Sequence, residues 1–199
     1  MKARITNTVV LRTEKTQVIE EPALREKMWA IYLDSFASSR KSCAQDQVCY
    51  DKENFLKALT DRDYWKFLVF AAETDEIVAF SLVTNNLEKA HIAYISPEYL
   101  CHQFPYYARR GRVYYVTALA VLPESQKSVK TFAAIIDSIQ TFIWENQAVV
   151  AYDFSENKNQ LLAKAIAEVG RRHGRPVATL ELDRQRYVAQ HFEAQGPPF

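Results

Sequence analysis

The residues with the clearest chemical meaning lie between an apolar run and an amphipathic one. Residues 123–130 read Pro-Glu-Ser-Gln-Lys-Ser-Val-Lys and follow the almost wholly apolar run 113–122. Apolar residues then recur at spacings of three and four from Phe132 to Ile143, which predicts a core-facing helix. A strand, a polar turn and a helix in this order place unpaired backbone N–H groups and the positive end of a helix dipole beside a sheet. Such a place suits a phosphate group.

Cysteine and histidine offer weaker alternatives. Cys43, Cys49 and Cys101 lack the closely paired spacing of a zinc site, so we predict no bound metal. Cys101 with His102 or His91 as base is a second hypothesis, for a nucleophilic cysteine. Adjacent side chains rarely face each other, which weakens the pairing of Cys101 with His102.

Composition excludes several classes of protein. The 199 residues are 48% hydrophobic and 25% charged, as in an ordinary globular domain. A net charge of +1 argues against nucleic acid and membrane surfaces as partners. No apolar run is long enough for a signal peptide or a membrane span, so we expect a cytoplasmic protein. Three arginines, Arg109, Arg110 and Arg112, either meet an anionic group or end a solvated loop.

Periodicity predicts the elements that precede the central run. They are one or two N-terminal strands, two helices and a hairpin, at residues 8–11, 16–19, 22–36, 52–60, 65–72 and 77–83. Pro22 suits the first turn of its helix, and Asp51 suits the N-cap of the next. Both hairpin strands are apolar on both faces, so we expect helices on both sides of the sheet.

Residues 85–112 form a long connection, in which Ser96-Pro97 resembles a helix start. The connection is either a lid or wall of an acceptor site, or a packed surface insertion. Beyond the central helix we expect a strand, a helix closed by Gly170, and a last strand, at residues 148–152, 155–170 and 177–182.

This order of elements resembles the GCN5-related N-acetyltransferase (GNAT) superfamily over nearly the whole chain. The most specific part is Leu-Ala-Val-Leu-Pro-Glu-Ser-Gln-Lys-Ser-Val-Lys-Thr at residues 119–131. It is similar to the family's fourth strand and pyrophosphate loop, where Val-x-Pro precedes Gln or Arg-x-x-Gly-x-Gly or Ala. The resemblance implies an α/β (α+β) fold in one domain, residues 1–199, with a mixed central sheet of about six or seven strands and helices on both faces.

The resemblance also implies how coenzyme A would be held. Backbone groups of Leu119, Ala120 and Val121 would contact pantetheine, and the following turn would wrap the pyrophosphate. The implied contacts of that turn, with one more after the fifth strand, are Gln126, Lys127, Ser128, Val129, Lys130, Thr131, Phe132 and Asn157. Val129 and Thr131 stand where the family has glycines, and β-branched side chains are bulkier and stiffer there. Hydroxyl and ammonium groups of the same turn offer compensating donors.

The family's acid–base groups are matched only in part. In the family, the asparagine is followed seven residues later by a tyrosine that protonates the leaving thiolate, but residue 164 is lysine here. The nearest polar candidates are Tyr115, Tyr152 and Asp153, each of which also fits a strand residue with a local hydrogen bond.

We therefore predict an N-acyltransferase that uses acetyl-CoA or another acyl-CoA as co-substrate, with a small-molecule or peptide amine as acceptor. The alternative is a catalytically inactive GNAT-fold module that binds a ligand or regulates, which Val129, Thr131 and Lys164 favour. A third hypothesis places a different thioester or acyl ligand in the same cleft. A homodimer is left open.

Overall fold

The computed structural model describes residues 10–37, 50–90, 95–125, 128–155, 161–175 and 177–184. The strands are β1 (Leu11–Thr16), β2 (Tyr64–Ala71), β3 (Glu76–Thr84), β4 (Val113–Val121) and β5 (Val149–Ala151). The helices are α1 (Pro22–Ala37), α2 (Lys52–Thr60), α3 (Pro97–Gln103), α4 (Pro105–Ala108), α5 (Val129–Glu145) and α7 (Leu162–Arg172), with short 3₁₀ turns η1 (Leu87–Lys89) and η2 (Pro123–Ser125).

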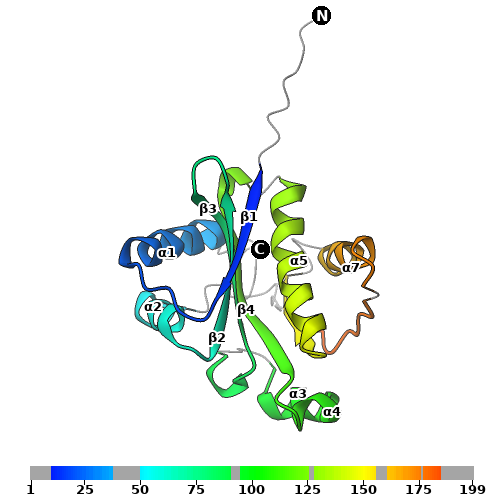
Figure 1. The fold of residues 1–199 in the computed structure, drawn as a ribbon. Coiled ribbons are helices and arrows are strands. Elements are labelled where there is room, and N and C mark those ends of the chain that lie inside the picture. Colours follow the sequence, from blue (N-terminus) through cyan, green and yellow to red (C-terminus); the bar gives the residue numbers. More distant parts are fainter. Residues whose placement is uncertain are drawn as a thin grey trace, which may run out of the picture.

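The strands form one mixed sheet in the order β1-β2-β3-β4-β5. Neighbouring strands are antiparallel except β4 and β5, which are parallel. Helices α1 and α2 lie on one face of the sheet, and α5 and α7 lie on the other (Figure 1). This confirms the predicted α/β class and the predicted helices on both faces.

Each face of the sheet carries its own apolar core. On the α1 and α2 side, Met28, Phe55 and Phe80 are fully buried. On the α5 side, the predicted stripe packs onto the sheet through Ile135, Ile139 and Phe142. Because β2 and β3 send apolar side chains to both cores, their sequences lack a polar face, as expected for a covered sheet.

Local signals placed most elements correctly. Asp51 accepts a hydrogen bond from the Asn54 N–H at 2.8 Å and so caps α2 as predicted. Ser96 does the same for α3, where its side chain accepts from the Tyr99 N–H at 3.1 Å.

Three expectations are wrong. The described residues contain five strands, whereas six or seven were expected, and the two N-terminal runs yield the single strand β1. The last predicted strand is absent, because residues 177–184 form no strand. Those last residues are largely exposed, so their alternating pattern has no core to meet. Gly170 does not close α7, which continues to Arg172; it is instead buried inside the helix.

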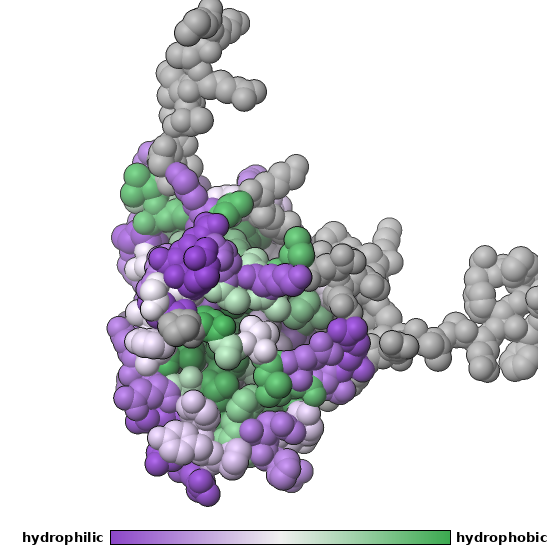
Figure 2. Space-filling model, turned by 90° about the vertical axis from the view of Figure 1, so that its right-hand side faces the viewer, coloured by the Kyte–Doolittle hydropathy of each residue, from purple (hydrophilic) through white to green (hydrophobic). Residues whose placement is uncertain are grey.

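The face that α7 occupies has hydrophobic surface near its middle, surrounded by hydrophilic side chains (Figure 2). Large exposed apolar side chains flank α7 in the sequence: Leu161, Val177 and Leu180. In the described part of the chain, no helix is both long and apolar enough to cross a membrane.

Candidate active site

The two parallel strands at the end of the sheet separate after a short common stretch. Strand β5 pairs with β4 over three residue pairs, from Val113↔Val149 to Tyr115↔Ala151. Strand β4 continues to Val121, whereas β5 ends at Ala151. Within the described ranges, no strand lies beside residues 116–121 on that edge. A backbone edge left in this way can pair with an extended ligand.

A β-bulge in β4 decides which backbone groups face this edge. Ala118 lies opposite Leu82 and Val116 lies opposite Val83, so Thr117 is the extra residue. An extra residue shifts the alternation of a strand by one position.

The backbone hydrogen bonds show this shift directly. Before the bulge, the Val149 N–H donates to the Arg112 carbonyl at 3.0 Å, so Arg112 and Tyr114 direct their backbone groups toward β5. After it, the Leu122 N–H donates to the Val78 carbonyl at 2.8 Å. Leu122 and Ala120 therefore face β3, and the odd-numbered residues face the edge that β5 has left.

This geometry divides the residues predicted to contact pantetheine. The backbone groups of Leu119 and Val121 are directed toward the edge of β4 beyond the end of β5, while those of Ala120 are directed toward β3. The Val121 carbonyl also accepts a hydrogen bond from the Ser35 hydroxyl at 3.0 Å, which ties the end of α1 to the end of β4.

The turn after β4 leads directly into the N-terminus of α5. Ser128 caps this helix, because its side chain accepts from the Thr131 N–H at 3.2 Å. Val129 and Lys130 occupy the first helical turn, where backbone N–H groups have no partner within the helix. Gln126 and Lys127 lie outside the described residues.

The two residues in the family's glycine positions do not strain the backbone. Val129 and Thr131 both belong to α5, and neither has a positive φ. The Val129 side chain is 74% exposed, whereas Thr131 is 3% exposed and part of the helix packing. Phe132 is half-buried against the α5 core. An ordinary helical start thus replaces a glycine loop, and its N-terminus remains suited to an anion.

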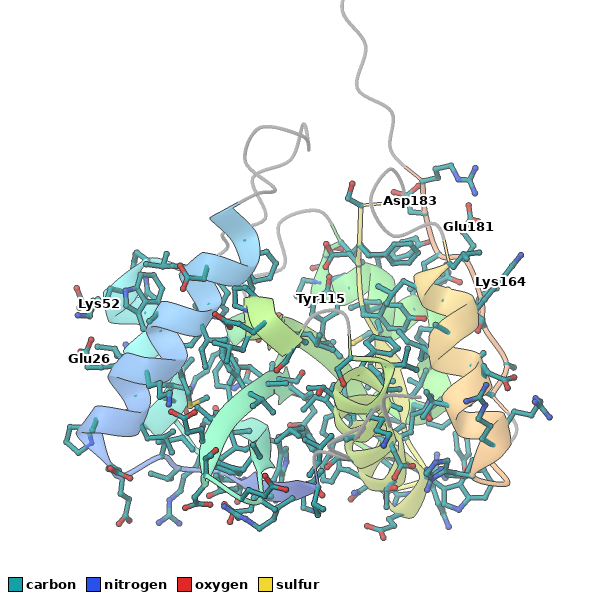
Figure 3. All side chains as sticks on the ribbon, turned by 90° about the horizontal axis from the view of Figure 1, so that it is seen from above. Glu26, Lys52, Tyr115, Lys164, Glu181 and Asp183 are labelled. Atoms are coloured by element: carbon teal, nitrogen blue, oxygen red, sulfur yellow. The ribbon has the colours of Figure 1, made fainter. Side chains whose placement is uncertain are left out.

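The polar candidates Tyr115 and Asp153 meet where the strands separate. The Tyr115 hydroxyl donates a hydrogen bond to the Asp153 carboxylate. Tyr115 is buried and comes from β4, while Asp153 is exposed and follows β5. In Figure 3, Tyr115 lies between the layers of helices, near the middle of the molecule.

Tyr152 lies beside this pair in the sequence. Burial raises the pKa of its phenol, so the hydroxyl stays protonated at neutral pH. Its ring stacks on Phe154 with a centroid distance of 6.2 Å.

Comparisons with known proteins agree with this architecture. No protein-family model matches the sequence, and no curated protein matches it. Among solved structures, one described as a probable acetyltransferase matches with a TM-score of 0.53 at 11% identity, covering 91% of this chain and 99% of that chain. An aminoglycoside acetyltransferase from an uncultured soil metagenomic sample matches with a TM-score of 0.50 at 15% identity, covering 90% and 99%.

The chain has the GNAT fold. The residues for which the resemblance implied contacts to coenzyme A, as far as the structure describes them, lie at the end of β4 and at the start of α5. The likeness covers nearly the full length of both chains, so the whole described sheet belongs to this one fold.

Residue 164, at the position of the family's thiolate-protonating tyrosine, is not a buried acid. Lys164 is exposed on α7, and in Figure 3 its side chain points outward, away from Tyr115. Asn157, the other matched residue of that motif, lies outside the described residues.

The remaining sequence candidates do not form a second site in the part of the chain that the structure describes. Cys101 is an exposed free thiol, while Cys43, Cys49 and His91 lie outside that part. No group of three His, Cys, Asp or Glu side chains suited to a metal occurs among the described residues. Arg110 stacks over the Tyr106 ring at 3.9 Å from its centroid, on the exposed surface of α4.

Two residues near the site were not predicted from sequence. Thr117 is the bulge residue, and Tyr50, which precedes α2, donates to its hydroxyl at 2.9 Å. An unbroken apolar run such as 113–122 carries no local mark of a bulge, and Tyr50 reads as the end of a loop.

Proposed function

We propose that this protein is an acyl-CoA-dependent N-acyltransferase, with acetyl transfer to an amine as its reaction. The observation that supports this most is the change of alternation at Thr117, which directs Leu119 and Val121 toward an edge that β5 has left. The capped N-terminus of α5 follows within a few residues along the chain. One continuous segment thus offers groups for an extended amide-containing chain and for a phosphate.

The residues of this segment fit coenzyme A. Leu119 and Val121 would bond pantetheine through their backbone, and the N–H groups of Val129 and Lys130 would face the pyrophosphate. The Lys130 ammonium is exposed next to them and supplies a positive charge. We retain Ala120, Phe132 and Thr131 as residues that shape this segment by packing. Gln126, Lys127 and Asn157 remain predicted contacts.

Acyl-CoA supplies an acyl group activated as a thioester. Transfer forms a bond between the amine nitrogen and the acyl carbon and breaks the carbon–sulfur bond. The nitrogen loses a proton and the thiolate gains one. Positioning alone contributes a large part of the acceleration in such bimolecular reactions.

Two described groups suit the proton transfers. The exposed Asp153 carboxylate, oriented by the Tyr115 hydroxyl, would attract the cationic amine and receive its proton. Tyr152 would donate a proton to the thiolate, since its phenol, whose pKa is raised by burial, carries its proton at neutral pH. Lys164 has no part in this scheme.

The acceptor would be a small-molecule or peptide amine. Helices α3 and α4, from the long 85–112 connection, pack beside the N-terminal end of β4, where Leu100 is buried in one cluster with Tyr115. We assign this segment to one wall of the acceptor site. An acceptor with a protonated amine fits the negative charge of Asp153.

A thermal-shift titration with acetyl-CoA, longer acyl-CoAs and free coenzyme A tests the binding step. A ligand that binds only the folded state raises the unfolding temperature, and the shift grows with the logarithm of the ligand concentration above its Kd. We expect a shift with acetyl-CoA, followed by release of free thiol when a panel of amines is added. No shift with any acyl-CoA would contradict the proposal.

The variant Asp153→Asn separates binding from transfer. We expect it to keep the acetyl-CoA shift and to lower kcat by about 100-fold, the usual scale of a lost general base. Glu26→Gln serves as control, because Glu26 is exposed, forms an ion pair with Lys52 and lies on the opposite side of the molecule from α7 in Figure 3. A shift without transfer in the wild-type protein would favour a binding module instead.

A further inference from the structure

The hydroxyl of Thr117 is bonded on both sides. It accepts a hydrogen bond from the Tyr50 hydroxyl at 2.9 Å and donates to the Leu82 carbonyl at 3.4 Å. On the other side of the bulge, the buried Ser81 hydroxyl donates to the Ala118 carbonyl at 2.8 Å. Side-chain hydroxyls therefore secure the place where the backbone ladder between β3 and β4 is interrupted.

Tyr50 is itself held in one position. It is 1% exposed, and its backbone N–H donates to the Tyr32 hydroxyl oxygen of α1 at 3.2 Å. Its ring packs edge-on against Phe55 of α2, with a centroid distance of 5.9 Å. The next residue, Asp51, caps α2. Tyr50 thus connects both helices of one face to the bulge of the central strand.

A bulge can move along its strand if nothing fixes it, because neighbouring registers differ by only one residue. A bulge moved past Leu119 would turn the backbone groups of Leu119 toward β3 and those of Ala120 toward the edge beyond the end of β5. Apart from its two tyrosines, Thr117 is the only residue of β4 with a hydroxyl side chain. The hydrogen bond from Tyr50 to this hydroxyl therefore favours Thr117 over its neighbours as the extra residue.

We propose that Tyr50 is a positioning residue that fixes the β4 bulge at Thr117 and thereby directs the backbone N–H and C=O groups of Leu119 toward the acyl-CoA. This inference rests on the proposed function, since it takes acyl-CoA as the ligand that the Leu119 backbone groups contact. Tyr50 itself does not touch the reacting atoms. Its effect passes through Thr117 to the backbone that follows.

Four variants test this role. Tyr50→Phe and Thr117→Val each remove one hydroxyl from the pair while keeping the bulk of the side chain. Thr117→Ser retains the hydroxyl and should restore what Thr117→Val loses. The matched control is Tyr114→Phe, which loses a tyrosine hydroxyl on β4 itself, on the opposite face, where its ring packs against Phe142.

The first measurement is amide hydrogen exchange of peptides covering residues 116–121, followed by mass spectrometry without ligand. Losing the hydrogen bond between Tyr50 and Thr117 should speed exchange there at least about fivefold in Tyr50→Phe and Thr117→Val. Exchange in Tyr114→Phe and Thr117→Ser should match wild type. Unchanged exchange in both hydroxyl-deleted variants would overturn the proposal, whatever the protein binds.

The second measurement is calorimetric titration with acetyl-CoA. We expect about fivefold weaker binding by Tyr50→Phe and Thr117→Val, with Tyr114→Phe at the wild-type value. If wild type binds and these two variants bind equally well, the positioning role fails and the proposed function stands. If wild type does not bind acetyl-CoA, the proposed function fails and the positioning role fails with it.

Discussion

At the scale of single residues, Lys66 is the most unusual side chain of the described core. It is fully buried, and its ammonium donates to the carbonyls of Gln17 at 2.7 Å, Asp61 at 2.6 Å and Tyr64 at 3.0 Å. It therefore joins the ends of β1, α2 and β2 at one point. Burial lowers the pKa of Lys66 to about 8, with the charge of Asp61 opposing this shift.

This pKa gives the folded protein a specific pH dependence. Between pH 8 and about 10.5 the unfolded chain keeps the Lys66 proton that the folded protein has released, so the free energy of unfolding should rise with pH. We expect Lys66→Met to lack this rise and to lose about 2 kcal/mol at pH 7, because three carbonyls lose their donor. Urea unfolding at pH 7, 8.5 and 9.5, below the titration of the buried tyrosines, measures both effects.

Lys52→Met is the matched control for Lys66→Met, since Lys52 is an exposed lysine paired with Glu26 at 2.8 Å. It should change the free energy of unfolding by less than about 1 kcal/mol and keep the wild-type pH dependence. Equal pH dependence in wild type and Lys66→Met would show that burial does not shift the lysine.

Lys130 gives a residue-scale prediction for the ligand. Because this ammonium is exposed in the first turn of α5, Lys130→Glu should weaken acetyl-CoA binding about fivefold at low salt, and less as salt is added. Lys164→Glu makes the same charge change on α7 and should leave the affinity at the wild-type value. Calorimetric titration at two salt concentrations measures this; equal losses in both variants would point to net charge alone.

At the scale of elements, the decisive unit is β4 followed by α5. The strand supplies an edge because β5 pairs with it only over Val113↔Val149 to Tyr115↔Ala151. The helix supplies a positive N-terminus without glycine, because Ser128 provides the cap. Val129 therefore adds an exposed side chain to the first turn of α5 without a positive φ.

The Ser128 cap separates helix stability from ligand binding. Ser128→Ala should lower the free energy of unfolding by about 1 kcal/mol, because the Thr131 N–H loses its acceptor. Ser128→Asp should keep the cap and its stability, since a carboxylate also accepts this bond and favours a helix N-terminus.

The same Ser128→Asp variant should bind acetyl-CoA more weakly than Ser128→Ala, because its negative charge would lie where the phosphates are expected. Urea unfolding and calorimetric titration on the same samples give the two values. Tighter binding by Ser128→Asp than by Ser128→Ala would exclude the α5 N-terminus as the phosphate site.

At the scale of the whole molecule, α7 is attached to α5 by close packing and by one ionic cluster. Arg175 donates to Asp137 of α5 and, at 2.8 Å, to the Thr141 hydroxyl. Gly170 lets the chain after α7 pass against the helix, because a Cβ there would lie 2.4 Å from Val177 Cγ2 and 3.0 Å from the Arg175 carbonyl oxygen. The glycine is needed for packing and not for ending the helix.

Gly170→Ala should therefore destabilise the protein by about 1–3 kcal/mol, although alanine is the better helix former. Gly170→Ala combined with Val177→Ala should recover part of this loss, because the closest contact is removed while the backbone contact remains. Denaturant unfolding of both variants and of Val177→Ala alone measures the coupling. A stabilised Gly170→Ala would mean that the segment after α7 moves aside freely.

By itself the sequence determined the elements, because each follows from short-range signals. The stripe from Phe132 to Ile143 predicted α5, and the caps Asp51 and Ser96 located α2 and α3. The apolar hairpin predicted a sheet covered on both faces. Where a segment needed a distant partner, prediction failed: residues 177–182 alternate like a strand, yet they pair with none of the described strands.

Only the tertiary structure decided which backbone groups of β4 face the candidate site. Every residue of 113–122 fits a buried strand equally well, so no local preference could place the bulge at Thr117 or select Leu119 over Ala120. That choice depends on the register with β3, on the early end of β5, and on a hydroxyl from Tyr50, 67 positions away in sequence. Strand register is a property of paired chains, and it arises when distant segments meet.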